Sequence, residues 1–394
     1  MDHTFKKKYD FILIECVYEM ILHYNYDVKN LAEILCSAGY KVAVVNYIDD
    51  NKYHENRIYD LINIKVNLNL PKMDKSAIGL GKLLKEIRLD FEKYIFFNTL
   101  FKMLNNQVHY ENIYIGSLRT ELISILFLKK IKKNIYVWGL RAHFLSINKF
   151  YIKKIRVNYR KILLKIMSKI RKINLFVTYE IIKKEFGKIG FPENSIVVRP
   201  ERTLRNIDYK INTGKIFSLL TVGSLREDKN IPFLINCIKN LENVNYVIAG
   251  KANKFVNNNV DIYLKKDKIK NITRISGFIP DKKYSSLFLE ASFMILADEP
   301  ELSTKTNGTF IEAIFQSLPI IAPNFSPYNQ IIKKYNIGLL YKSGSKESLR
   351  KVIELSQNYN QDFFKAGLLQ FQEDHLLENV AQQVKIQLGT TVSE

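Results

Sequence analysis

The sequence is poor in cysteine, and its three cysteines, Cys16, Cys36 and Cys237, stand far apart without a C-x-x-C pair. This spacing argues against a disulfide framework or a zinc site, and it is typical of buried thiols in a reducing compartment. No stretch reaches the roughly 18 apolar residues that a membrane-spanning helix needs. The first nine residues are polar and basic, and Glu15 interrupts the apolar run that follows, so we expect no signal peptide.

Signatures of cofactors and metals are also missing. The first expected strand is not followed by G-x-G-x-x-G, so a dinucleotide is not implied. The pair Asp49-Asp50 lacks the loop setting of a D-x-D metal site. We therefore expect no metal and no cofactor.

Acidic residues are few: 39 Asp and Glu against 60 Lys and Arg leave a formal net charge of +21. Such a surplus predicts an anionic partner, which could be nucleic acid, anionic lipid or a phosphorylated substrate. No nucleic-acid-binding motif accompanies the charge, so we do not expect nucleic acid.

The 394 residues are 47% hydrophobic, enough for two domains with real cores. Short buried strands alternate with helical patterns in both halves, which predicts an α/β class with parallel sheets. A polar segment after Arg199 marks the expected hinge. We therefore expect domains at 1–205 and 206–372, followed by a terminal helix at 373–394. The strands expected in the first half are 9–17, 41–48, 93–98, 112–116, 134–138, 173–179 and 195–198.

The stretch 305–323, KTNGTFIEAIFQSLPIIAP, is the centre of the second half. Small polar residues precede a short helix over 310–315, and Pro319 ends it before a buried strand. Free N–H groups at the start of such a helix suit a phosphate group. A second interpretation stays open, because Thr309 and Glu312 have the spacing of a capping box that only stabilises the helix.

Other motifs stand upstream in a fixed order. A buried strand ends at Gly223 and leads into a loop with Arg226 and Lys229, and a second strand, NYVIAG, ends at Gly250. The segment NITRISGFIP, a helix and the strand SFMILAD follow. This order, ending in Glu312-Ala313, resembles the C-terminal half of a GT-B glycosyltransferase of the "group 1" type.

The resemblance implies two Rossmann-like domains that face each other across a cleft, with the terminal helix crossing back to the first domain. In this family the Lys binds the donor diphosphate and the Glu before Ala binds the nucleotide ribose. The donor-binding residues implied here are Gly223, Ser224, Arg226, Lys229, Gly250, Thr306, Asn307, Gly308, Thr309 and Glu312.

The sequence departs from the family at two positions. Ser224 stands where members often have Arg, and Arg226 is a candidate substitute. Thr304 stands where retaining members usually have a second Glu, so Glu301 is our candidate for that catalytic role. Retention or inversion at the sugar carbon is therefore not fixed.

In the first half, the strand 134–138 leads directly to Arg141 and His143. A His in a comparable loop often lies at the point of sugar transfer in the enzymes that the chain resembles. His143 could orient or deprotonate an acceptor hydroxyl. Glu15 and His23, placed on the loop after the first strand, are with Arg141 the acceptor-side candidates, although ordinary loop polarity also explains them.

Residues 149–172 carry ten Lys or Arg, no acidic residue, and apolar residues at helical spacing. A basic amphipathic helix is typical of a peripheral contact with an anionic membrane surface. The alternative is a helix packed on the core with a solvated basic face.

Together these features predict a metal-independent hexosyltransferase on the cytoplasmic face of the cell membrane. It would move a sugar from a nucleoside-diphosphate sugar to a hydroxyl of a glycan or lipid-linked acceptor, in the assembly of cell-surface polysaccharide or glycolipid. Two alternatives are a sugar-nucleotide epimerase of the same fold and a non-catalytic sugar-nucleotide-binding protein.

Overall fold

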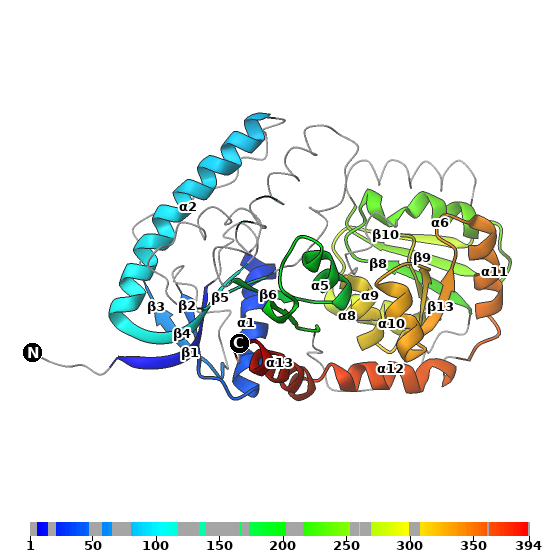
Figure 1. Cartoon of the computed structure of the whole chain (residues 1–394). Helices are drawn as coiled ribbons and strands as arrows, with labels where there is room; N and C mark the ends of the chain where they lie inside the picture. The colour runs from blue at the N-terminus through cyan, green and yellow to red at the C-terminus, as the bar shows by residue number, and fades with distance from the viewer. Residues whose placement is uncertain are drawn as a thin grey trace, which may run out of the picture. The chain divides into compact units, whose positions relative to one another are not determined.

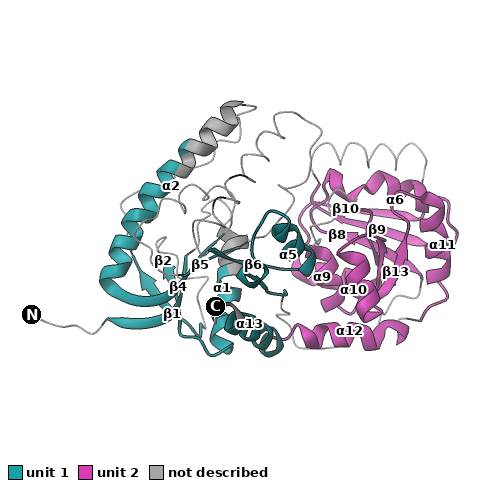
Figure 2. Cartoon of the chain, in the orientation of Figure 1, with its two compact units in different colours: residues 1–202, 377–394 teal, residues 203–376 magenta. Residues whose placement is uncertain are grey.

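A computed structural model describes residues 6–14, 21–46, 57–64, 80–116, 134–138, 162, 166, 173–201, 216–252, 260, 269–298, 308–360 and 362–392. The chain forms two compact units: residues 1–202 with 377–394, and residues 203–376 (Figure 2). Each unit contains its own parallel sheet. The predicted α/β class with two Rossmann-like domains is confirmed.

The sheet of the first unit has the order β3-β2-β1-β4-β5-β6-β7, and all its neighbouring strands are parallel. Strands β1 to β6 are labelled in Figure 1. The order reverses between β1 and β4, which is the switch point where ligands bind in doubly wound sheets. The strands are β1 (Lys7–Ile14), β2 (Val42–Asn46), β3 (Asp60–Asn63), β4 (Val108–Ile115), β5 (Asn134–Trp138), β6 (Ile173–Val177) and β7 (Ile196–Val198).

Alternating side chains of β1 supply two cores, one on each face of this sheet. Phe11 and Leu13 pack with helix α1 (Ile21–Ser37). Ile12 and Ile14 lie in the core on the other face, with buried residues of α2 (Leu80–Gln107) and α5 (Glu180–Gly187). Burial on both faces explains why the strands read as nearly continuous apolar runs.

The predicted strand at 93–98 is wrong, because these residues belong to α2. The apolar run YIFF is compatible with a strand when it is read alone. In the structure Phe97, Leu100, Phe101 and Leu104 are fully buried at helical spacing, so the buried face continues through this run. Strand β3 lies instead in the stretch 49–73, for which the pattern gave no assignment.

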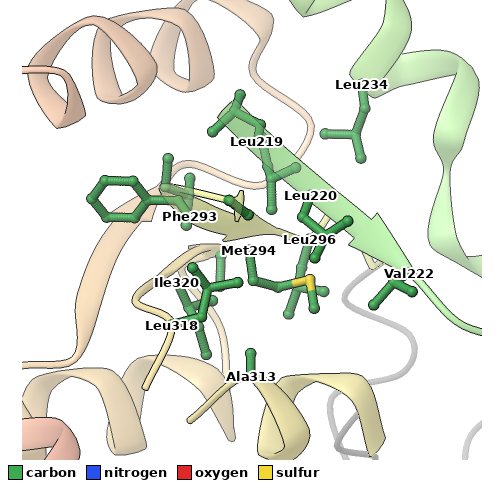
Figure 3. Close-up of a cluster of buried hydrophobic side chains, with 14 of the residues drawn as sticks. Leu219, Leu220, Val222, Leu234, Phe293, Met294, Leu296, Ala313, Leu318 and Ile320 are labelled. Carbon is green, nitrogen blue, oxygen red and sulfur yellow. The ribbon is translucent and has the colours of Figure 1, made fainter. Parts of the chain in front are cut away.

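The second sheet has the order β10-β9-β8-β11-β12-β13, again with parallel neighbours and a reversal between its first and fourth strands along the chain. Figure 3 shows its apolar centre, where side chains of β8 and β11 meet Ala313 and Ile320. The strands are β8 (Ser218–Val222), β9 (Asn245–Gly250), β10 (Ile272–Ser276), β11 (Phe293–Ile295), β12 (Ile320–Pro323) and β13 (Gly338–Tyr341).

The helices of this unit follow the sequence pattern closely. The ranges expected for α10 (Tyr328–Tyr335) and α11 (Lys346–Ser356) are confirmed, and the last helix of the unit, α12 (Asp362–Asp374), extends beyond its expected end. The others are α6 (Ile231–Ile238), α8 (Asp281–Glu290) and α9 (Gly308–Phe315).

The terminal helix α13 (Leu377–Val392) belongs to the first unit, where it packs on α1 and β7 (Figure 1). Val380 and Val384 join the core that α1 covers. The Gln387 side chain accepts a hydrogen bond from the Val198 N–H at 2.7 Å and donates one to the Val198 carbonyl at 2.8 Å. Helix α13 thereby covers part of an edge strand whose backbone groups would otherwise stay open.

Candidate functional site

Among the described donor candidates, Gly223, Lys229 and Gly250 lie at or just beyond the carboxyl ends of β8 and β9, next to the switch point between β8 and β11. Gly223 follows β8 with φ of 103°, and Gly250 ends β9 with φ of 132°. A Cβ atom on Gly250 would lie 1.9 Å from the Gly223 carbonyl oxygen. Only glycine permits this approach, so the two loops meet at the carboxyl ends of their strands.

Helix α9 begins beside the same glycine. A Cβ atom on Gly223 would lie 2.8 Å from Thr309 Cγ2 and 3.8 Å from Lys229 Nζ. The site therefore combines the backbone of Gly223, which no side chain covers, with the Lys229 ammonium and the first turn of α9. Free N–H groups and a nearby ammonium are the combination that binds phosphate.

Lys229 ends the short 3-10 turn Glu227–Lys229 and is only 4% exposed. Its Nζ donates a hydrogen bond to the Val222 carbonyl at 3.2 Å. Burial lowers the pKa of Lys229 from 10.5 to about 8, and the nearby Asp298 carboxylate opposes this effect. A buried cation of this kind is a recurring mark of functional sites, because burying a charge without function is costly.

Ser224 and Arg226 lie on the solvent side of this loop. The Arg226 guanidinium binds the Asp228 carboxylate through two hydrogen bonds of 3.0 and 3.1 Å. This pairing raises the pKa of Arg226. The Asp228 carboxylate offsets the charge of Arg226, so Lys229, beside Gly223, is the better placed cation of the two.

Glu312 lies on α9, where its carboxylate accepts a hydrogen bond from Gln316 Nε2 at 2.9 Å. The structure describes α9 from Gly308, with Thr309 in its first turn. The alternative of a capping box between Thr309 and Glu312 stays open. The ribose role of Glu312 stays a prediction.

Asp298 and Tyr328 also belong to this site, and neither was among the predicted site residues. Asp298 is 6% exposed just beyond β11, and its carboxylate accepts a hydrogen bond from the Tyr328 hydroxyl. The sequence carried one signal for Asp298, a carboxylate that ends the apolar run SFMILAD. Nothing in the sequence indicated Tyr328, which stands thirty residues away.

Most of the remaining predicted residues lie outside the described residues, and their roles stay predictions. They are Glu15, Arg141, His143, Glu301, Thr306 and Asn307. His23 was expected on a loop, but it lies in α1, whose first residue is Ile21. The helix starts earlier than the apolar pattern indicated.

The fold agrees with the comparisons to known proteins. Residues 206–362 match the family described as "Glycosyl transferases group 1". A comparison with curated proteins finds no match.

Three solved structures share the fold over nearly the whole chain. The lipopolysaccharide outer core galactosyltransferase WaaB is 12% identical, with 97% of this chain and 100% of that chain covered and a TM-score of 0.67. Sucrose-phosphate synthase from Thermosynechococcus elongatus is 14% identical, with coverage of 95% and 97% and a TM-score of 0.66. HepE of Anabaena, in complex with UDP, is 11% identical, with coverage of 97% and 100% and a TM-score of 0.64.

Two parallel sheets with this strand order, and a phosphate-suited loop on the second, define the GT-B class of glycosyltransferase folds. Residues 206–362 match the glycosyl transferases group 1 family, so the resemblance noted in this part of the sequence is confirmed. Among the described helices, none is both long and apolar enough to cross a membrane.

Proposed function

We propose that the protein transfers a hexosyl group from a nucleoside-diphosphate sugar to a hydroxyl of a glycan or lipid-linked acceptor. The observation that carries this proposal is the buried Lys229 ammonium beside Gly223 and the first turn of α9. Glycosyl transfer from such a donor leaves negative charge on the diphosphate. A fixed cation and oriented N–H groups stabilise that charge without reorganisation.

The solved relatives support the donor class. HepE has been solved with UDP and with UDP-glucose, and TarM of S. aureus with UDP. We propose that a nucleoside diphosphate binds this chain at the end of the second sheet where Gly223 and Lys229 lie. Lys229 would bind the diphosphate, Gly223 and Gly250 would let it approach the backbone, and Glu312 would bind the ribose. No metal is needed in this scheme, since Lys229 and the helix start supply the positive potential.

For the first unit we propose the acceptor side. His143 would accept the proton of the acceptor hydroxyl or orient it, with Arg141, Glu15 and His23 near the acceptor. Glu301 would take the catalytic role of the second family Glu, on the donor side. These residues follow from the sequence pattern and the family resemblance.

We also propose a peripheral association of residues 149–172 with the anionic cytoplasmic face of a membrane, where a lipid-linked acceptor of a surface polysaccharide or glycolipid would lie. The structure describes two residues of this segment, Ile162 and Ile166. Both are helical, and they expose 59% and 37% of their surface. Residues four apart share one helix face, so an exposed apolar side fits lipid contact better than core packing.

The experiment that tests the proposed function is a donor panel. The protein is incubated with UDP-, GDP-, dTDP- and ADP-sugars, and nucleoside diphosphate release is measured with and without a lipid-linked glycan. We expect release from one donor class, accelerated by acceptor and about tenfold to a hundredfold slower for Lys229→Met, because a charge-assisted contact contributes roughly 1.5–3 kcal/mol.

The His143→Ala variant in the same assay should lose about a hundredfold in turnover if His143 moves the acceptor proton. Conversion of a nucleotide sugar without any release of diphosphate would identify an epimerase instead. Binding of the nucleotide with no turnover on any acceptor would identify a non-catalytic protein.

A further inference from the structure

Asp298 is a buried carboxylate beside the loop that presents Lys229. Strand β11 pairs with β8 in parallel, with Phe293 opposite Leu219 and Met294 opposite Leu220. The chain that continues beyond β11 therefore runs alongside the end of β8, where Val222 and Gly223 lie. Asp298 is 6% exposed there and sits at the carboxyl edge of the sheet with the Lys229 ammonium.

The Asp298 carboxylate is fixed by a residue from α10. The Tyr328 hydroxyl donates a hydrogen bond to Asp298 Oδ2. Tyr328 is 1% exposed, and its ring packs against Phe310 of α9 at 4.9 Å and Phe325 at 5.5 Å between centroids. A packed ring of this kind has one orientation, so the carboxylate that it binds is held in place.

The described charges around Lys229 are Asp298, Arg226 and Asp228. Burial lowers the pKa of Lys229, Asp298 raises it, Arg226 lowers it and Asp228 raises it by less. Asp298 is therefore the main group that keeps this ammonium charged in the folded protein. Asp298 also raises the pKa values of Arg226 and Tyr341.

We propose that Asp298 is a positioning residue of the donor site, a fixed buried counter-ion that balances the charge of the Lys229 ammonium until the donor diphosphate replaces it. This inference rests on the donor site proposed above. The Asp298 carboxylate then has two opposite effects on the affinity for the diphosphate. The carboxylate keeps Lys229 charged, which favours diphosphate binding, but it also repels the diphosphate directly. Its removal should therefore help binding at low pH and weaken it at high pH.

The test measures nucleoside diphosphate affinity by calorimetry between pH 6.5 and 9.5. The probe is whichever of UDP, GDP, dTDP and ADP the wild-type protein binds most tightly. Asp298→Asn should bind it several-fold more tightly than wild type at pH 6.5. At pH 9 it should bind about tenfold more weakly, since a fall of one unit in the pKa of Lys229 lowers the charged fraction tenfold. The two affinity curves should cross.

Asp374→Asn is the matched control, because Asp374 also accepts a tyrosine hydrogen bond, from Tyr335 at 2.7 Å, and lies at the end of α12. Its affinity curve should follow wild type. Tyr328→Phe keeps the Asp298 charge and loses its anchor, so its curve should shift in the direction of Asp298→Asn by a smaller amount. If Asp298→Asn does not fold, the affinity curve of Tyr328→Phe is compared with wild type in its place.

Two results would overturn the inference: an Asp298→Asn curve that coincides with wild type, or one lowered by a constant factor at every pH, as a purely structural role would give. Failure of the donor site itself looks different. In that case wild type binds none of the four nucleotides, or Lys229→Met binds them as tightly as wild type.

Discussion

Gly250 lies directly against Gly223: a Cβ atom on Gly250 would fall 1.9 Å from the Gly223 carbonyl oxygen and 2.8 Å from its carbonyl carbon. The neighbour that would have to move is backbone, so no side-chain rotation can relieve the clash. The contact fixes the loop that carries Lys229 to the end of the adjacent strand. Because it joins residues 27 positions apart, it is a property of the folded sheet.

Gly250→Ala should displace the Gly223 loop. We expect a loss of roughly 2–4 kcal/mol in the free energy of unfolding, together with loss of nucleotide binding, since both a left-handed φ and a clash are involved. Gly277→Ala is the control, because Gly277 has φ of 94° and nothing near its Cβ position. Urea denaturation and calorimetry measure both effects. Equal losses in the two variants would show that backbone conformation alone matters.

Gly223→Ala should weaken nucleotide binding because the added methyl group meets Thr309 Cγ2 at 2.8 Å. Thr309→Ser removes that methyl carbon and keeps the hydroxyl. The double variant should therefore recover part of the affinity lost by Gly223→Ala, with a coupling of about 1 kcal/mol in a double-mutant cycle. Strictly additive effects would contradict the packing of α9 against this loop.

Lys229 should make stability depend on pH. Its folded pKa of about 8 lies below the ordinary value of 10.5, so between these pH values the unfolded chain binds more protons. Stability therefore rises as the pH increases from 8 to 10.5, and the buried charge destabilises the protein below pH 8. Lys229→Met should be more stable than wild type at pH 7, by up to about 3 kcal/mol.

That difference should shrink towards zero near pH 10.5. Buried tyrosines also titrate in this range, but they are the same in both proteins, so the difference between the two urea-denaturation profiles isolates Lys229. A difference that does not vary with pH would contradict the lowered pKa.

Glu312→Gln separates a ribose ligand from a helix contact. If the carboxylate binds the ribose, affinity for the nucleoside diphosphate should fall about tenfold, while a 2′,3′-dideoxy analogue is bound equally by both proteins. Gln316→Met is the control, because it removes the donor of the 2.9 Å hydrogen bond to Glu312 without changing the carboxylate. The ribose role fails if Glu312→Gln leaves both affinities unchanged.

The basic segment should bind anionic vesicles. Each basic side chain near an anionic leaflet contributes about 1 kcal/mol, and salt screens this attraction. We expect the protein to sediment with anionic vesicles at low salt and to be released at high salt. Replacement of Lys153, Lys154, Arg160 and Lys161 by Gln should leave it in the supernatant with donor hydrolysis intact.

A control with the same change in charge replaces four exposed lysines of the second unit by Gln: Lys282, Lys283, Lys333 and Lys346. It should sediment like wild type. Equal binding to neutral and anionic vesicles would refute the electrostatic attachment, and so would equal release of the two quadruple variants.

The sequence by itself determined the local helices and strands wherever the spacing of apolar residues agreed with the residues that begin or end such elements. The strands NIYVW and NYVIAG and the helices α10 and α11 have the bounds that the pattern predicts. It failed at 93–98, where a four-residue apolar run suits a strand and a helix equally, and only packing against the first sheet decides between them. It also missed β3, whose four residues are too few to show a period.

The same division holds for the residues of the proposed donor site. Gly223, Lys229 and the start of α9 could be found from the sequence, because each follows a strand or precedes a helix in a recognisable order. Only the tertiary structure showed that Gly250 touches Gly223 and that Tyr328 holds Asp298. Local sequence specifies which strands and helices form. The order in which the strands pair specifies which of their carboxyl ends become neighbours, and pairing is set by packing between residues far apart in the chain.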